Sequence, residues 1–291
     1  YLHEIEDTYD VVFENLDSLT GDALLAAGMA GNDVCDFMFL QTTDWGRYML
    51  GGYTRQLDTD EVRATGLDVL DENQVDINTV NAAKIAGQVH YFRFTCAVIP
   101  AQLGRLFAVN PSLVAAAGYP IETIYQAVRD NQWTWDVMLD ICHAGAVLNQ
   151  ETGIYDICGI SKIFVYPEMN TLCKGMIYYD EASGKYVSGI TDVTFVSALN
   201  TVVNRIIMDP SIMYTDMNKG VGNGFGNSAS RQRFYDGCAL FGTFDNFVDD
   251  LYPNTNFEYG IVPFPRGSAA TSYVTTLQTI GGFVLPTANQ D

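Results

Sequence analysis

The chain has 291 residues, of which 48% are hydrophobic and 17% charged, and its formal net charge is −20. This apolar content excludes a disordered chain, and the length is enough for two lobes. The surplus of carboxylates argues against a nucleic-acid partner and against a polybasic membrane patch, and no run of about 18 apolar residues predicts a membrane span.

The first third of the chain alternates short apolar runs with helical patterns. Such an alternation predicts right-handed crossovers in a doubly wound sheet. The apolar run 36–40 has the length of a parallel strand that is covered on both faces. The predicted strands are 9–13, 36–40 and 87–92, the predicted helices are 22–30 and 44–50, and 58–85 has only weak helical patterning.

Residues 105–140 contain well-marked helix boundaries. A strand over 105–109 runs into Asn110-Pro111, and proline suits the first turn of a helix. Gly118 suits the left-handed end of that helix, and a second helix follows Pro120. Thr134 is a candidate N-cap for a third helix that begins at Trp135.

The remainder of the chain mixes strands, a hairpin and helices. The turn at 180–185 predicts a hairpin between 176–179 and 186–187. The glycine-rich stretch 220–230 matches neither a dinucleotide fingerprint nor a Walker loop, so it is interpreted as a loop. The other predicted strands are 155–160, 238–241, 259–263 and 279–285, and the other predicted helices are 192–208, 230–235 and 245–251.

Metal and catalytic motifs are weak. The six cysteines form no CxxC pair, and free buried thiols are preferred over one or two disulfides, for which Cys142 and Cys158 are the nearest pair in sequence. Neither GxSxG nor HExxH occurs, and the three histidines are scattered. No metal, cofactor or catalytic residue is therefore predicted.

Five segments, taken in order, resemble the carbohydrate-type (family 1) extracellular solute-binding proteins of bacterial ABC importers. In 107–140 the sequence FAVNPSLVAAAGYPIETIYQAVRDNQWTWDVMLD is similar to the segment after that family's first interlobe crossing, and 259–267 (YGIVPFPRG) is similar to its second crossing. The family has further elements before residue 1 and after residue 291, so both ends are expected to be incomplete relative to it. The other three segments are 25–40, 85–91 and 234–242.

The resemblance implies a two-lobed α/β fold of the type II periplasmic-binding-protein kind, in which each lobe is a mostly parallel sheet flanked by helices. The N-terminal lobe is expected to comprise 1–104 and 259–291, and the C-terminal lobe 105–258. Hinge crossings are expected near 104–110 and 258–266.

Ligand-binding residues are expected just after strands, because ligands of open α/β sheets bind at the carboxyl ends of the strands. Trp45 can equally stack on a sugar or pack its helix, and Trp133 and Trp135 are expected to pin a helix start. The candidates are Gln41, Thr42, Asp44, Trp45, Phe94, Thr95, Lys162, Tyr166, Thr243, Phe244 and Asp245.

The resemblance implies a non-enzymatic, monomeric component of an ABC importer that captures a small solute, most often a carbohydrate or oligosaccharide, by hinge closure. It further implies ABC permease subunits as partners and an extracellular location, either lipid-anchored or periplasmic. Two alternatives stay open: a carbohydrate-active hydrolase with paired carboxylates, and a surface sensor or interaction module that does not transport.

Overall fold

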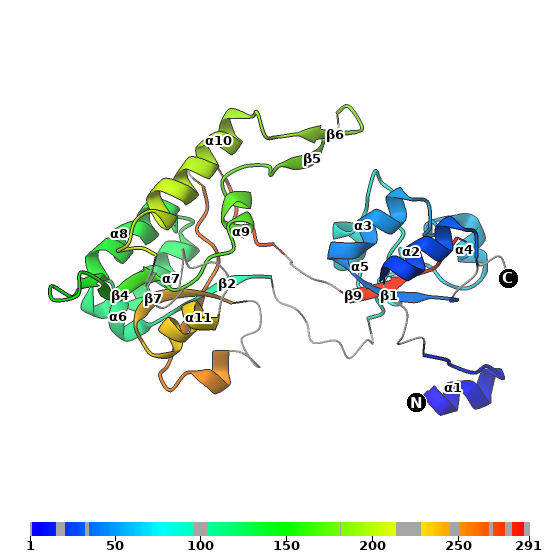
Figure 1. The fold of residues 1–291 in the computed structure, drawn as a ribbon, viewed down its shortest axis with the longest axis horizontal. Coiled ribbons are helices and arrows are strands. Elements are labelled where there is room, and N and C mark those ends of the chain that lie inside the picture. The colour runs from blue at the N-terminus through cyan, green and yellow to red at the C-terminus, as the bar shows by residue number, and fades with distance from the viewer. Residues whose placement is uncertain are drawn as a thin grey trace. The chain divides into compact units, whose positions relative to one another are not determined.

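The computed structural model describes residues 2–15, 21–32, 35–95, 104–180, 182–213, 228–244, 251–267, 270–276 and 281–287. The chain divides into two compact units (Figure 1). The first comprises Tyr1–Val98 and Thr279–Asp291, and the second comprises Ile99–Gln278. Each unit has its own hydrophobic core.

The first unit is built around a two-stranded sheet. Strand β1 (Met38–Gln41) pairs antiparallel with β9 (Gly281–Val284), so the end of the chain completes the first unit. Trp45 of α3 and Tyr91 belong to its main buried cluster, together with Met38 and Val284. Its helices are α1 (Leu2–Tyr9), α2 (Gly21–Met29), α3 (Thr42–Leu50), α4 (Asp60–Ala64) and α5 (Ile77–Ala82).

Two strands predicted in the first unit are wrong. Residues 9–13 form no strand: Tyr9 is the last residue of α1, and Val11 and Val12 are exposed and pair with no neighbouring strand among the described residues. Residues 87–92 make only isolated bridges, one of which joins Phe92 to Phe283. A strand needs a continuous hydrogen-bonded neighbour, and an apolar sequence run cannot show whether one is present.

The second unit contains a five-stranded sheet in the order β3-β4-β7-β2-β8. The expectation of a mostly parallel sheet is wrong for the described strands of this unit, where β4 with β7 is the only parallel pair. The chain enters the unit at β2 and passes through β8 shortly before it leaves, and these two neighbouring strands are antiparallel. The strands are β2 (Leu106–Val109), β3 (Val147–Leu148), β4 (Tyr155–Ile160), β7 (Ala239–Phe244) and β8 (Gly260–Val262).

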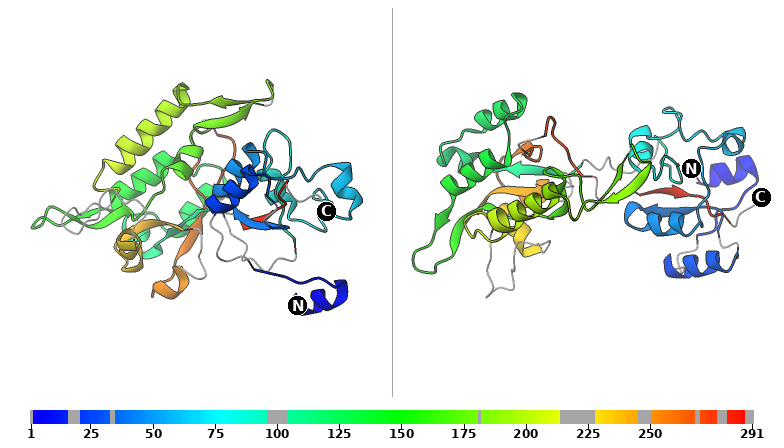
Figure 2. Two further views of the ribbon diagram at one scale, coloured as in Figure 1. Left: turned by 45° about the vertical axis from the view of Figure 1, so that its right-hand side comes forward. Right: turned by 90° about the horizontal axis from the view of Figure 1, so that it is seen from above.

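Helices cover both faces of this sheet (Figure 2). Along β2, Phe107 and Val109 join the larger core cluster on one face while Ala108 joins the smaller cluster on the other, as the alternation of a strand requires. Phe234 of α11 packs in the smaller cluster. The helices of the unit are α6 (Pro111–Ala116), α7 (Ile121–Arg129), α8 (Trp135–Gly145), α9 (Tyr166–Asn170), α10 (Val193–Asn200) and α11 (Ser228–Tyr235), with the π-helix η1 (Thr201–Ile207) and the 3₁₀-helix η4 (Tyr252–Asn254).

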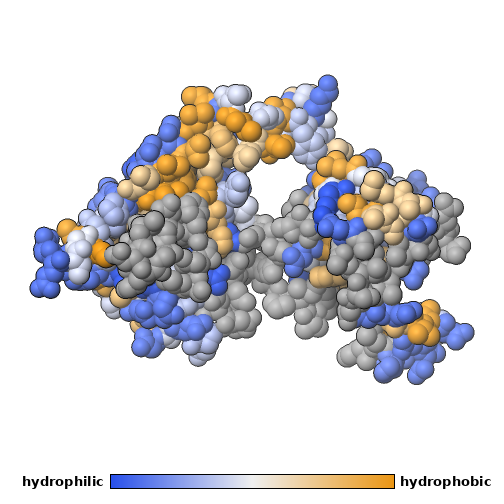
Figure 3. Space-filling view, in the orientation of Figure 1, coloured by the Kyte–Doolittle hydropathy of each residue, from blue (hydrophilic) through white to orange (hydrophobic). Residues whose placement is uncertain are grey.

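A hairpin and part of α10 carry an exposed apolar surface (Figure 3). The hairpin of β5 (Ile177–Asp180) and β6 (Lys185–Ser188) is confirmed, with Gly184 at a φ of 63° in its turn. The long helix expected over 192–208 divides into α10 and the π-helix. The exposed side chains are Met176, Ile177, Tyr186, Ile190, Val193, Val196 and Leu199.

The second crossing lies later in the chain than 258–266. β8 pairs with β2, and the backbone N–H of Arg266 donates to the carbonyl oxygen of Trp133, so these residues belong to the second unit. Next to the segment where the chain enters this unit, the Thr275 hydroxyl donates to the carbonyl oxygen of Arg105 at 2.5 Å. The entering and leaving segments are therefore hydrogen-bonded to each other.

The five described cysteines are free thiols, Cys142 and Cys158 included. Within the described ranges, no helix is long and apolar enough to cross a membrane. No group of three or more potential metal ligands occurs among the same residues.

Candidate functional site

One edge of the second unit's sheet collects polar and charged side chains. β4 and β7 end at this edge, and β2, antiparallel to β7, begins there with Leu106 opposite Phe244. The Thr243 hydroxyl donates to the carbonyl oxygen of Lys162 at 3.0 Å, which joins the ends of β7 and β4. This register brings Arg105 and the segment 161–168 together.

Two buried cations lie over one aromatic ring at this edge. The Arg105 guanidinium carbon is 3.2 Å from the centroid of the Phe164 ring, and Lys162 Nζ is 4.0 Å from it. Both cationic side chains are buried. Cation–π attraction is strongest where water is excluded, so it helps to fix the position of the Phe164 ring.

Glu168 supplies a buried carboxyl to the same cluster. Its two side-chain oxygens each lie 3.3 Å from the backbone nitrogen of Phe164, whose N–H donates to them. Burial raises the pKa of Glu168 to about 7, although N–H donors and the charge of Arg105 act in the opposite direction. The group therefore changes its charge near neutral pH.

The backbone between Phe164 and Tyr166 is strained. Val165 has φ 68° and ψ −58°, and the Tyr166 N–H donates to the Phe164 carbonyl oxygen at 2.9 Å, which defines a γ-turn. A positive φ is costly for a β-branched residue, and such strain persists only where the surroundings enforce it. The turn leaves the side chain of Tyr166 63% exposed, directly after the buried cluster.

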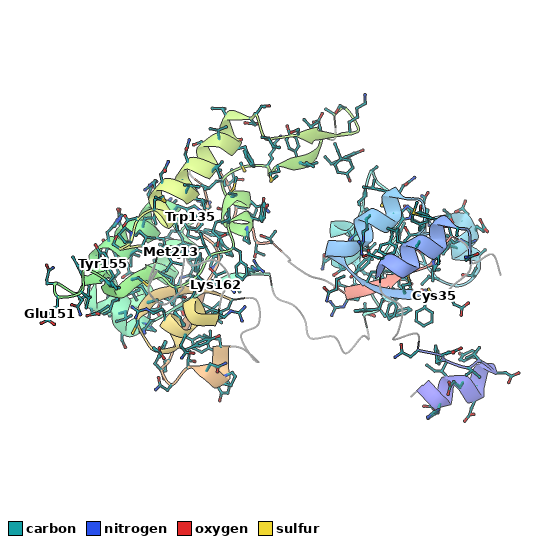
Figure 4. All side chains as sticks on the ribbon, in the orientation of Figure 1. Cys35, Trp135, Glu151, Tyr155, Lys162 and Met213 are labelled. Atoms are coloured by element: carbon teal, nitrogen blue, oxygen red, sulfur yellow. The ribbon has the colours of Figure 1, made fainter. Side chains whose placement is uncertain are left out.

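Helix α9, which follows the turn, is anchored by Trp135. The Trp135 indole N–H donates to the Thr171 hydroxyl at 2.7 Å, and that hydroxyl donates to the carbonyl oxygen of Glu168 at 2.8 Å. Trp133 and Trp135 are both buried, as is consistent with their expected structural role. Figure 4 labels Trp135 and Lys162 in the second unit.

The predicted site residues of the second unit differ in exposure. Lys162, Thr243 and Phe244 are buried, and Phe244 packs on Phe234 with ring centroids 5.5 Å apart. Asp245 lies outside the described residues. Tyr166 is thus the one predicted candidate of this unit, among those described, whose side chain is largely exposed to solvent.

In the first unit, Trp45 packs in the core and Gln41 is exposed. The side chain of Trp45 is only 6% exposed, and its ring lies 6.0 Å from that of Tyr91. Of the two roles expected for Trp45, the structure therefore has the one in which it packs its helix. Thr95 is exposed, and its hydroxyl donates to the carbonyl oxygen of Asn73 at 3.3 Å. Thr42 and Asp44 stand in the first turn of α3, but their side chains lie outside the described ones.

Phe94 belongs to an aromatic cluster that sequence reasoning missed. Its ring lies 5.0 Å from that of Phe92 and 6.1 Å from that of Phe283, and Phe283 also contacts Phe37 and Phe39. A Cβ at Gly281 would collide with the Phe39 ring, which explains the glycine. Phe39 is 51% exposed, so this part of β1 is not covered on both faces as expected.

Arg105 and Glu168 were also absent from the predicted site. Glu168 stands within a largely apolar run, KIFVYPEM, and this is the only sequence signal that could have suggested a buried carboxyl. Arg105 directly precedes β2 instead of following a strand, so a search of residues after strands does not find it.

No protein-family model and no curated protein matches the chain. Solved structures do match its fold: UgpB of Mycobacterium tuberculosis in complex with glycerophosphocholine (TM-score 0.59, 15% identity, 100% of this chain), an ABC substrate-binding protein of Listeria monocytogenes in complex with cycloalternan (0.60, 13%, 99%), and maltose-bound MalE3 of T. maritima (0.58, 16%, 99%). The chain spans 66%, 67% and 68% of these three proteins, respectively. It therefore has the two-lobed fold of ABC solute-binding proteins, as its sequence resemblance implied.

Proposed function

We propose that this chain is the substrate-binding component of an ABC importer and that it captures a small solute without chemical change. The observation that carries the proposal is the fold, which matches ABC solute-binding proteins over at least 99% of the chain. The strained turn that presents Tyr166 at the edge of the sheet supports it, because strained backbone clusters at ligand-binding positions.

Carbohydrates are the proposed ligand class. Cycloalternan and maltose occupy two of the similar proteins, and glycerophosphocholine occupies a third. Tyr166 and the aromatic cluster of the first unit offer partly exposed rings whose apolar faces suit a sugar, and Tyr166 adds a polar tip. Glu168 is fully buried, which makes it a poor candidate for a hydrolase acid that must reach a glycosidic oxygen.

The proposed mechanism is closure of the two units on the solute, followed by transfer to permease subunits at an extracellular or periplasmic membrane face. The bond between Thr275 and Arg105 supports a paired hinge, because it couples the entering and leaving segments.

A thermal-shift panel tests the proposal. The whole chain is screened against monosaccharides, oligosaccharides, glycerophosphodiesters, amino acids and peptides, and every hit is recovered and identified by mass spectrometry. A solute that binds only the folded protein raises Tm by mass action. Recovery of an unchanged solute supports a binding protein, recovery of a cleaved one supports the hydrolase, and no Tm rise with any compound counts against solute capture.

A further inference from the structure

A buried carboxyl lies directly beneath the turn that presents Tyr166. We propose that Glu168 is a positioning residue for the solute-facing edge of the second unit: by accepting the Phe164 N–H, its carboxyl holds the strained turn from Phe164 to Tyr166 and thereby fixes the exposed phenol. The inference rests on the proposed function only in assigning a solute to Tyr166.

The need for a positioning residue follows from the backbone. A γ-turn centred on valine is intrinsically unfavourable, so contacts on either side must enforce it. Arg105 and Lys162 hold the ring of Phe164 on one side. On the other side the Val165 carbonyl oxygen accepts the Met169 N–H at 2.8 Å. Glu168 joins the two sides, because its side chain binds Phe164 while its backbone is part of α9.

The end of α9 is held independently of the carboxyl. Thr171 links the Glu168 carbonyl oxygen to the Trp135 indole, and the Gly267 N–H donates to the Thr171 carbonyl oxygen at 3.1 Å. Replacement of the Glu168 side chain should therefore release the turn and leave the far end of α9 in place. This separation distinguishes a positioning role from general support of the fold.

The charge state of Glu168 should couple the turn to pH. The charge that acts on the carboxyl is that of Arg105, which precedes β2, while Lys162, which follows β4, lies over the Phe164 ring; Tyr166 is the titratable group at the start of α9 itself. An opened turn would return the carboxyl to water, where its pKa is 4.5, whereas in the closed turn burial raises the pKa to about 7. The stabilisation is complete below 4.5 and is lost as pH rises through about 7, so deprotonation favours the open turn.

The test compares wild type with Glu168→Gln and Glu168→Ala, and Glu122→Gln serves as a matched control at an exposed carboxylate of the same unit. The first readout, which needs no solute, is amide exchange of Phe164 and Tyr166 at about pH 5.5 and about pH 8, corrected for intrinsic exchange. The second is the affinity for the solute found in the panel.

At the higher pH, the wild type should lose protection at these two amides. Its affinity for the solute should fall several-fold. Glu168→Gln is always neutral and keeps an acceptor, so its corrected values should not change with pH. Glu168→Ala should lose protection at both pH values and bind about tenfold more weakly, the effect of one misplaced aromatic contact. The control should behave as the wild type does.

Two results would overturn the proposal. In the first, a folded Glu168→Ala protein keeps the amide protection and the affinity of the wild type. In the second, Glu168→Gln still responds to pH as the wild type does. If Glu168→Ala does not fold, the pH response of Glu168→Gln decides. If no solute binds the wild type, the proposed function fails while amide exchange still decides the role of Glu168.

Discussion

The indole N–H of Trp133 donates to the carbonyl oxygen of Pro263 at 3.0 Å, across 130 residues of sequence. This bond ties the segment after β8 to the loop before α8. The backbone of Trp133 is anchored as well: its carbonyl oxygen accepts the Arg266 N–H, and its N–H donates to the Tyr273 hydroxyl oxygen. Trp133 therefore holds the late part of the chain in the second unit.

Replacement of Trp133 by phenylalanine should destabilise this unit. The substitution leaves the Pro263 carbonyl without its donor and removes part of a fully buried side chain, which together should cost about 2–4 kcal/mol. Urea unfolding followed by circular dichroism measures the change. Tyr252→Phe, at an exposed position, should stay within about 0.5 kcal/mol of wild type, and an equal loss in both variants would refute the role of this bond.

Asn110 should contribute stability as the cap of α6. Its side-chain oxygen accepts the N–H groups of Ser112 and Leu113 at 3.1 and 3.2 Å, ahead of Pro111 in the first turn. Asn110→Ala should cost about 1–2 kcal/mol, whereas Asn110→Asp keeps an acceptor and should cost much less. Urea unfolding of both variants measures the difference, and a similar loss in the two would contradict a capping role.

Gly159→Ala and Gly46→Ala should act in opposite directions. A Cβ at Gly159 of β4 would lie 2.5 Å from Cβ of Cys142 on α8, so the helix must move away from the sheet, at about 1–3 kcal/mol. A Cβ at Gly46 of α3 meets nothing within 4 Å, and alanine should stabilise that helix by up to about 1 kcal/mol. Thermal unfolding of each variant provides the measurement, and a stabilised Gly159→Ala would show that α8 packs less closely than the structure has it.

Burial of Glu168 should make stability depend on pH. A carboxyl whose folded-state pKa is raised stabilises the fold below its unfolded pKa of 4.5, and this contribution, on the order of 3 kcal/mol, is lost as pH rises through about 7. The unfolding free energy of Glu168→Gln minus that of the wild type should therefore increase between about pH 5 and about pH 8, because only the wild type loses stability. A difference that stays constant over this range would show that the carboxyl is not buried in the folded protein.

Elements with local causes were predictable from the sequence. The helix starts at Asn110-Pro111 and Thr134-Trp135, the left-handed Gly118 at φ 90° and the hairpin turn at Gly184 all follow from side chains next to the backbone they control. Capping and turn formation act over a few residues, so one sequence contains the necessary information.

Strand direction and burial of the site could not be predicted in the same way. β1 pairs with β9, more than 200 residues away, and its apolar run does not reveal whether that neighbour runs parallel or antiparallel. Thr243 and Phe244 were expected just after a strand but are the last two residues of β7, and whether such residues face solvent or the core depends on distant side chains such as Phe234. Glu168 resembles a surface acid until tertiary packing encloses it.

Calorimetric titration of the panel's best solute into wild type, Tyr166→Ala and Trp45→Ala is the decisive test of solute capture at Tyr166. Tyr166 is exposed, so its alanine variant should keep the wild-type Tm and bind at least about tenfold more weakly. Trp45 is buried, so its alanine variant should lose packing. Its free energy of unfolding should fall by about 3–5 kcal/mol, and its Tm should fall accordingly. Wild-type affinity in Tyr166→Ala, with the solute bound at one site per chain, would contradict a contact between the solute and Tyr166.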